Sequence, residues 1–289
     1  MHKTKIGLHT FMAIPAFALF SLFFLYPLAK GIGMSLTDWD GISAAKFIGL
    51  ANFKEFFQDD RAINDIKTTL LFALGSAPLL NIFGLIYALL MDSKFKAKGI
   101  ARMIIYLPAV ISPLIMGYIW YLLLQPGRGF IYHVLDNMGQ GELFGNWLGT
   151  YSTSMIVLVL VNVWQYAGMT MVVYLAGLQA IPGELYEAAK MDGASFNKRL
   201  RYITLPLLTP SIRINIVTNI IGSLSVFDIV MSLTAGGPGY ATETLSIYIM
   251  RMCYGSKTGY STAVAIIMFF IILIPVIAAM RLTRAKSEY

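Results

Sequence analysis

Residues Thr258–Met280 read TGYSTAVAIIMFFIILIPVIAAM, an uncharged stretch that becomes almost wholly apolar after its first few residues. The hydrocarbon core of a bilayer is about 30 Å thick, so about 20 apolar residues in a helix cross it. Backbone N–H and C=O groups in lipid have to pair within the segment, and a helix satisfies all of them internally. This stretch therefore predicts a transmembrane helix and indicates a helical membrane protein.

The composition of the whole chain agrees with that prediction. Of its 289 residues, 57% are hydrophobic and 13% are charged, whereas a soluble domain has about 25% charged residues. One cysteine and three histidines exclude an internal disulfide framework and argue against a metal site. The sequence contains neither a phosphate-binding glycine loop nor a Ser-His-Asp or Cys-His arrangement. We therefore predict no catalytic residue, no metal and no cofactor in this chain.

Further uncharged or nearly uncharged runs raise the number of predicted spans to six, so the fold class is an all-α, polytopic membrane protein. The fifth span has the weakest signal, because Arg213 lies near one end and Asp228 near the other. We place Asp228 at the membrane interface and expect Arg213 to extend its long side chain toward the lipid headgroups. The predicted spans are residues 11–33, 68–91, 103–125, 154–178, 207–230 and 258–281.

The basic residues predict how these spans are oriented. Residues 1–10, the connections 92–102 and 179–206, the inner end of the fifth span and the C-terminus together carry 14 bases and five acids. The opposite side carries eight bases and ten acids. Lys and Arg accumulate on the cytoplasmic side of a membrane, so we expect both termini to be cytoplasmic and residues 34–67 to be extracytoplasmic. The net charge of +7 is then a topology signal, and nucleic acid is not an expected partner.

The cytoplasmic connection 179–206 contains an ordered local pattern. From residue 181 it reads IPGELYEAAKMDGASFNKRLRYITLP. Pro182 suits a helix start, and Gly193 can adopt the left-handed conformation that ends a helix. These signals predict a short helix over Glu184–Asp192, and a second helix that begins near Ser195 and continues into the fifth span.

The same segment carries a family resemblance. Glu187-Ala188-Ala189, then three residues, Gly193, nine residues and Ile203-Thr204-Leu205-Pro206 resembles the EAA signature of permease subunits of bacterial ABC importers. Without the downstream Ile-x-Leu-Pro, a solvated connection would explain the loop equally well. Other stretches resemble the carbohydrate-uptake branch, which includes the maltose and glycerol-3-phosphate permeases, and the likeness covers nearly the whole chain. They are LTDW at 36–39, FIGLANF at 47–53, LTAGGPG at 233–239 and TET at 242–244.

The resemblance implies a type I ABC importer permease with a core over residues 68–286, in the bacterial cytoplasmic (inner) membrane. It implies a second, related permease as heterodimer partner and two cytoplasmic ATPase subunits, which would bind ATP and Mg. It also implies an extracytoplasmic solute-binding protein, which would dock near the turn at Gly236–Gly239. In this family the EAA helix contacts the ATPase. The residues expected to couple the two subunits are Glu184, Glu187, Ala188, Ala189, Asp192 and Gly193.

Polar residues in the middle of the spans are the candidates for the solute path, because polar groups in lipid are costly unless they face a cavity or a partner. Asn162, Gln165 and Tyr166 lie in the fourth span, and Asn219 and Ser223 lie on one face of the fifth. Amides and hydroxyls suit sugar hydroxyl groups. The alternative for each residue is a hydrogen bond between helices.

We therefore expect a permease subunit for a sugar or oligosaccharide that works by alternating access. One alternative is an ion-coupled carrier, but no confident span has an acid near its middle for proton relay. Another is a permease for a non-carbohydrate solute such as a glycerol phosphate. A membrane-embedded enzyme would need a polar catalytic cluster, which the sequence does not contain.

Overall fold

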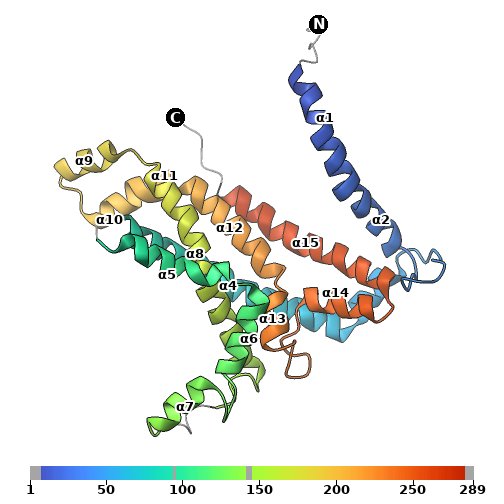
Figure 1. Ribbon diagram of the computed structural model, residues 1–289. Coiled ribbons are helices and arrows are strands. Elements are labelled where there is room, and N and C mark those ends of the chain that lie inside the picture. The colour runs from blue at the N-terminus through green and yellow to red at the C-terminus, as the bar shows by residue number, and fades with distance from the viewer. Residues whose placement is uncertain (1–7, 94–95, 141–144, 284–289) are drawn as a thin grey trace. The chain divides into compact units, whose positions relative to one another are not determined.

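The computed structural model describes residues 8–93, 96–140 and 145–283. Within these ranges every regular element is a helix, and the only β contact is an isolated bridge between Thr37 and Phe47 (Figure 1). The chain divides into two compact units, which are described separately below. One comprises Met1–Asp60 with Tyr248–Phe269, and the other comprises Arg61–Ile247 with Phe270–Tyr289.

The helices differ widely in length, from single turns to more than 30 residues. Two short π-helical segments, Ser21–Leu25 and Leu200–Thr204, continue neighbouring α-helices. In chain order the α-helices are α1 (Leu8–Phe20), α2 (Tyr26–Ser35), α3 (Ala51–Gln58), α4 (Asp60–Asp92), α5 (Lys98–Val110), α6 (Pro113–Leu123), α7 (Phe130–Asn137), α8 (Tyr151–Gln179), α9 (Gly183–Met191), α10 (Phe196–Arg199), α11 (Leu205–Leu207), α12 (Thr209–Leu224), α13 (Asp228–Leu233), α14 (Leu245–Tyr254) and α15 (Thr258–Leu282).

Four helical segments are long and apolar enough to cross a membrane: Ala13–Ser35, Asp60–Asp92, Tyr151–Gln179 and Thr258–Leu282. Two further pairs meet the same criteria together but are bent. Lys98–Val110 meets Pro113–Leu123 at 95°, and Phe196–Leu207 meets Thr209–Leu224 at 70°. The described chain therefore has four candidate spans, or six if each bent pair is one span.

The bend in the third candidate span has a local cause. Ser112 precedes Pro113, and the proline ring disfavours helical backbone in the residue before it. Ser112 accordingly has a non-helical ψ of 132°, and Ile111 before it is extended as well, with ψ of 138°. The segment 103–125 therefore contains parts of two helices. The segment 207–230 is also divided, because α12 ends at Leu224 and α13 begins at Asp228.

In the larger unit, α8 contacts α5, α12 and α13, and α6 packs on α13. Ala88 and Met91 near the end of α4 pack with Leu175 and Leu178 near the end of α8. The contact between α5 and α8 is close, because a Cβ atom added at Gly168 would lie 2.3 Å from the Ile105 carbonyl oxygen. The ends of α4 and α8 that precede the connections 93–97 and 180–182 therefore lie together.

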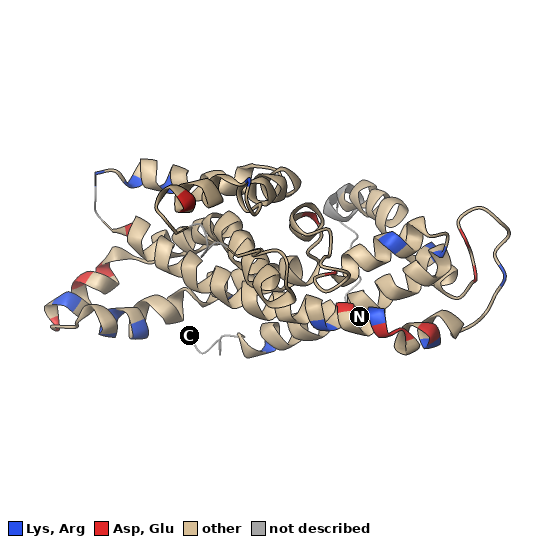
Figure 2. Ribbon diagram, turned by 90° about the horizontal axis from the view of Figure 1, so that it is seen from below, with Lys and Arg blue, Asp and Glu red and all other residues tan. Residues whose placement is uncertain are grey.

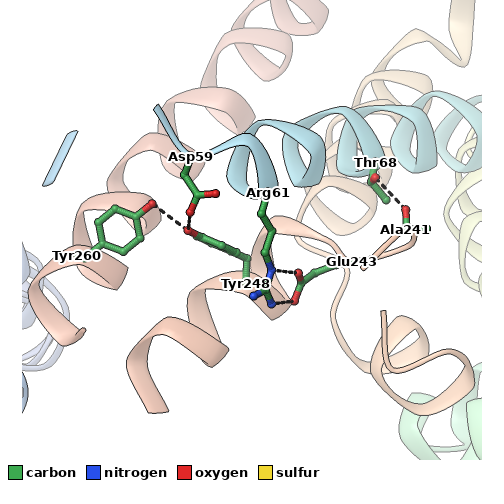
Figure 3. Close-up of polar contacts among 7 residues, drawn as sticks. All are labelled: Asp59, Arg61, Thr68, Ala241, Glu243, Tyr248 and Tyr260. Carbon is green, nitrogen blue, oxygen red and sulfur yellow. Dashed lines mark hydrogen bonds and ion pairs between the residues drawn. The ribbon is translucent and has the colours of Figure 1, made fainter. Parts of the chain in front are cut away.

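The smaller unit contains a buried network of polar side chains. The Asn52 amide donates to the carbonyl oxygens of Ser35 and Thr37, each at 2.8 Å. The Tyr248 hydroxyl donates to Asp59 and lies 2.9 Å from the Tyr260 hydroxyl (Figure 3). Burial raises the pKa of Tyr248, and the hydrogen bond to Asp59 raises this pKa further. These bonds hold Tyr248 of α14 to Asp59 and Tyr260 within this unit.

The extended segment between α2 and α3 has an acidic turn. Asp40 Oδ1 accepts hydrogen bonds from the backbone N–H groups of Ile42 and Ser43, at 2.9 and 2.8 Å. These bonds stabilise the carboxylate and lower the pKa of Asp40. Figure 2 shows the wider pattern, in which charged residues gather at helix ends and in connections while long helical stretches carry none.

Candidate functional site

The predicted coupling segment forms a short helix with a well-defined end. α9 covers Gly183–Met191 and starts after Pro182, one residue earlier at each end than the expected 184–192. Gly193 has φ of +71°, in the left-handed region. The N–H groups of Ala194 and Gly193 donate to the carbonyl oxygens of Ala189 and Lys190, at 2.8 and 3.1 Å. This pair of bonds is the Schellman arrangement that ends a helix, as the glycine predicts.

The rest of the described chain leaves most of the α9 surface uncovered, so another protein could contact it. None of its residues is buried. Glu184, Glu187, Ala188, Asp192 and Gly193 are exposed, and Ala189 is half-buried. One hydrogen bond, between the hydroxyl oxygens of Tyr186 and Thr204 at 3.0 Å, ties α9 to the segment that leads into α12. The predicted coupling residues therefore occupy one short, accessible element.

A second candidate region is a cavity of about 470 Å³ in the larger unit, bordered by α8, α12 and the start of α13. Leu80 of α4 and Pro113 also border it. Its wall is mainly apolar, with neutral polar groups and one carboxylate. The polar side chains on the wall are Asn162, Tyr166, Thr170, Asn215, Thr218, Asn219, Ser223, Ser225 and Asp228.

Four of the five residues predicted for the solute path lie on this wall, namely Asn162, Tyr166, Asn219 and Ser223. Gln165 is placed elsewhere. It is fully buried, and its Nε2 donates to the Ile111 carbonyl oxygen at 3.1 Å, at the break between α5 and α6. The physical reason is helical rotation, since Gln165 and Tyr166 are adjacent and face directions about 100° apart.

The alternative role, hydrogen bonding between helices, applies to part of the wall. Asn219 Nδ2 donates to the Thr170 hydroxyl oxygen at 3.3 Å, and Asn215 Nδ2 donates to the Thr170 carbonyl oxygen at 3.1 Å. The Ser223 hydroxyl is buried and has no hydrogen-bond partner among the described residues. Asn219 therefore joins α12 to α8 while lining the cavity, and Ser223 keeps its hydrogen-bonding capacity unused.

Sequence reasoning missed five polar residues of this wall, namely Thr170, Asn215, Thr218, Ser225 and Asp228. Thr170 lies four residues after Tyr166 in α8, and Asn215 lies four residues before Asn219 in α12. Helical spacing alone could therefore have found these two residues. Asp228, expected at the membrane interface, borders the cavity because α12 ends at Leu224 and the chain turns into α13. No lysine or arginine is among the described residues of the wall. In the described ranges, no group of His, Cys, Asp or Glu could hold a metal ion.

Comparison with known proteins identifies the family. Residues 81–287 match the model of the binding-protein-dependent transport system inner membrane component. The chain belongs to this family. The permease is 31% identical to a trehalose/maltose transport system permease protein of Thermococcus litoralis, over 99% of the chain and 96% of that relative. It is also 31% identical to a multiple sugar-binding transport system permease protein of Streptococcus mutans, over 95% of the chain and 94% of the relative.

A solved structure with the same fold supports that assignment. The permease matches a chain of a bacterial ABC transporter involved in the import of the acidic polysaccharide alginate, with a TM-score of 0.83 and 26% identity. The match covers 97% of the permease and 96% of that chain. A second structure is the bacterial alginate transporter in complex with an alginate pentasaccharide-bound periplasmic protein, again with a TM-score of 0.83. The expected permease fold of an ABC importer is therefore confirmed.

Proposed function

We propose that this permease carries a neutral sugar or oligosaccharide as one subunit of an ATP-driven importer. The observation that carries the proposal is the cavity between α8 and α12, whose wall combines amides, hydroxyls and one carboxylate with apolar surface. Sugars present hydroxyl groups that both donate and accept hydrogen bonds, together with apolar C–H faces. The sugar permeases among the relatives support this solute class.

The charge of the cavity favours a neutral solute. A glycerol phosphate or a uronic acid would bring negative charge, which arginine or lysine commonly pairs in binding sites. The described wall has Asp228 and no lysine or arginine. An anionic solute would meet repulsion from this chain, so the glycerol phosphate alternative has no support from the cavity.

The exposed helix α9 is the proposed contact with the ATPase. Its Glu187 and Ala188 are exposed, and the left-handed Gly193 fixes the direction of the following chain. ATP and Mg would be bound by two ATPase subunits, and this permease would pair with a second, related permease in the cytoplasmic membrane. Movement of α9 would be passed to α12 through residues 195–208, alternately opening the cavity to the two sides.

Coupling is tested in the purified complex of this permease with its partner permease, the ATPase and the binding protein. The double variant Glu187→Ala/Gly193→Val is expected to abolish the ATP hydrolysis that the solute-loaded binding protein stimulates. Valine disfavours the left-handed backbone that Gly193 adopts. The amount of permease inserted in the membrane should equal that of the wild type.

The matched control is Asp136→Ala, which removes an exposed acid from α7. It should leave the stimulated hydrolysis unchanged. Stimulated hydrolysis at the wild-type rate in the double variant would refute the role of α9. A complex that contains two copies of this chain and no other membrane subunit would refute the heterodimer.

A further inference from the structure

Helix α7 lies in the connection between α6 and α8, and a tight turn joins it to the end of α6 (Figure 1). The Gly129 backbone N–H donates to the Gln125 carbonyl oxygen at 2.8 Å. Gly129 is buried, and a Cβ atom added to it would lie 2.4 Å from the Leu123 carbonyl oxygen. The start of α7 is therefore held close to the last residues of α6.

One side of α7 packs on the rest of the larger unit. Ile131, Tyr132 and Leu135 are half-buried and pack against the hydrophobic cluster that includes Leu158 of α8. Successive residues of a helix are turned by about 100°, so these three side chains cover a sector that begins about 100° from Phe130 and ends about 200° from it. This sector attaches α7 to the protein.

A second apolar side of α7 is exposed. Phe130, Val134 and Met138 keep 67%, 40% and 67% of their surface accessible. Met138 directly follows the last residue of the helix. The three residues are four positions apart, so they form a row about 80° wide, next to the packed sector. This row, here called the α7 stripe, is not covered by the rest of the described chain.

The remaining side of α7 is polar. His133 and Asp136 are exposed, and both lie outside the apolar sector of about 200° that runs from Phe130 to Tyr132. The protein covers one half of that sector, and the α7 stripe is the other half. A short helix with a wide apolar side and a polar side is typical of helices that lie in the plane of a membrane interface.

The neighbouring surface of α6 indicates what covers the α7 stripe. Ile115, Tyr118 and Leu122 are exposed along one face of α6, which is part of a candidate span. Tyr121 near the end of α6 and Tyr151 at the start of α8 flank the connection that contains α7. Tyrosine is enriched where a span meets the lipid headgroups. The connection is therefore placed at headgroup level, beside an apolar surface that lipid can cover.

The two ends of α8 place α7 in one leaflet. α8 has 29 residues, so its ends are about 43 Å apart. α7 precedes the first residue of α8, and α9 follows its last residue. Because α9 is the proposed contact with the cytoplasmic ATPase, α7 lies at the outer leaflet.

We propose that α7 is an interfacial helix whose stripe of Phe130, Val134 and Met138 inserts into the outer leaflet of the bilayer, with His133 and Asp136 facing water. Lipid is the partner because the stripe is uncharged, lies at headgroup level and follows the exposed apolar face of α6. α6 also packs on α13. The membrane surface would thus hold the outer end of a helix that supports the cavity wall, whichever solute is carried.

The test measures the depth of single sites on α7 in the purified complex with the partner permease and the ATPase, reconstituted in lipid nanodiscs. Single cysteines are introduced in a Cys253→Ser background and labelled with a nitroxide. The sites are Phe130→Cys, Val134→Cys and Met138→Cys on the stripe, and His133→Cys and Asp136→Cys on the polar side. Relaxation of each nitroxide by oxygen, which concentrates in lipid, is compared with relaxation by a water-soluble nickel chelate.

The three sites on the stripe should respond more to oxygen than to nickel, and the two polar sites should respond more to nickel. Leu122→Cys on the exposed face of α6 is the reference for a site in lipid. Elution of each labelled complex as one monodisperse peak shows that it is folded. The stripe carries three independent sites, so loss of one variant leaves the comparison intact.

Each other outcome refutes the proposal. A stronger response to nickel at Phe130 and Val134 would place the stripe in water. Weak responses to both reagents would show that another subunit covers it. A fall in the oxygen response on addition of the solute-loaded binding protein would assign the stripe to that protein. The measurement reads lipid contact and not transport, so its result stays separate from success or failure of the proposed import function.

Discussion

The carboxylate of Asp228 is the strongest single acceptor on the described cavity wall, and it lies among neutral groups such as Asn162 and Ser223. A charged acceptor makes stronger hydrogen bonds to hydroxyl groups than an amide does. Its position at the first residue of α13 also places it where a helix N-terminus stabilises negative charge. Asp228 is therefore well placed to accept hydrogen bonds from the hydroxyl groups of a sugar.

Replacing this carboxylate with an amide is a sharp test of the cavity. Asp228→Asn should reduce uptake of a neutral oligosaccharide by about tenfold, because a hydrogen bond to a charged group contributes about 1.5–3 kcal/mol. Uptake is measured in proteoliposomes with saturating amounts of the sugar-loaded binding protein. Asp136→Asn is the control, since it removes an exposed carboxylate of α7, away from the described wall. Wild-type uptake by Asp228→Asn would exclude this residue from the solute path.

Among the helices, the packing of α8 on α5 depends on one glycine. A Cβ atom at Gly168 would lie 2.3 Å from the Ile105 carbonyl oxygen and 2.8 Å from the Tyr106 Cα. Both contacts are with backbone, so no rotation of a side chain relieves them. The two helices would have to move apart, and overpacking of this kind costs about 1–3 kcal/mol.

Gly168→Ala should therefore lower the melting temperature of the detergent-solubilised complex, measured by the loss of monodisperse protein after heating. Gly33→Ala is the matched control. It is also a helical glycine, but an added Cβ atom meets no atom within 4 Å in the described structure, and alanine is the better helix former. Its melting temperature should equal or exceed that of the wild type. Equal melting temperatures for the two variants would contradict the close contact.

Local signals in the sequence predict some elements well and others poorly. The start of α9 after Pro182 and its end at Gly193 depend on the backbone preferences of these two residues. Such preferences can be read from the residue types alone. The bend at Ser112 also has a local cause in Pro113, but composition alone gave one uninterrupted run over 103–125. The break between α12 and α13 shows no such signal, and Asp228, which follows it, borders the cavity.

Side-chain pairs that are distant in sequence were beyond prediction. Arg61 and Glu243 are 182 positions apart, and a single sequence holds no signal that joins them. Gln165 is grouped with Asn162 and Tyr166 as a polar residue in the middle of one predicted span, but its side chain faces the break between α5 and α6 and donates to the Ile111 carbonyl oxygen. Helical spacing identifies a face of a helix, but the neighbour that covers that face is decided by the fold.

For the molecule as a whole, orientation in the membrane is a prediction from charge. The single cysteine, Cys253, is exposed on α14, in the connection expected to be extracytoplasmic. A membrane-impermeant maleimide should therefore label it in intact spheroplasts of cells that express the chain. In a Cys253→Ser background, cysteine introduced by Lys190→Cys on exposed α9 should be labelled only after permeabilisation.

The two sites form a matched pair, because each is exposed on a short helix outside the candidate spans. Labelling of both after detergent treatment provides the control for accessibility. In the described chain, the bent pair that includes α12 is the one candidate span between residues 190 and 253. If it crosses the membrane once, the two cysteines lie on opposite sides and are labelled from opposite sides. Labelling of both cysteines from the same side would show that this bent pair does not cross the membrane, whereas a reversed pattern would keep the crossing and overturn the charge-based orientation.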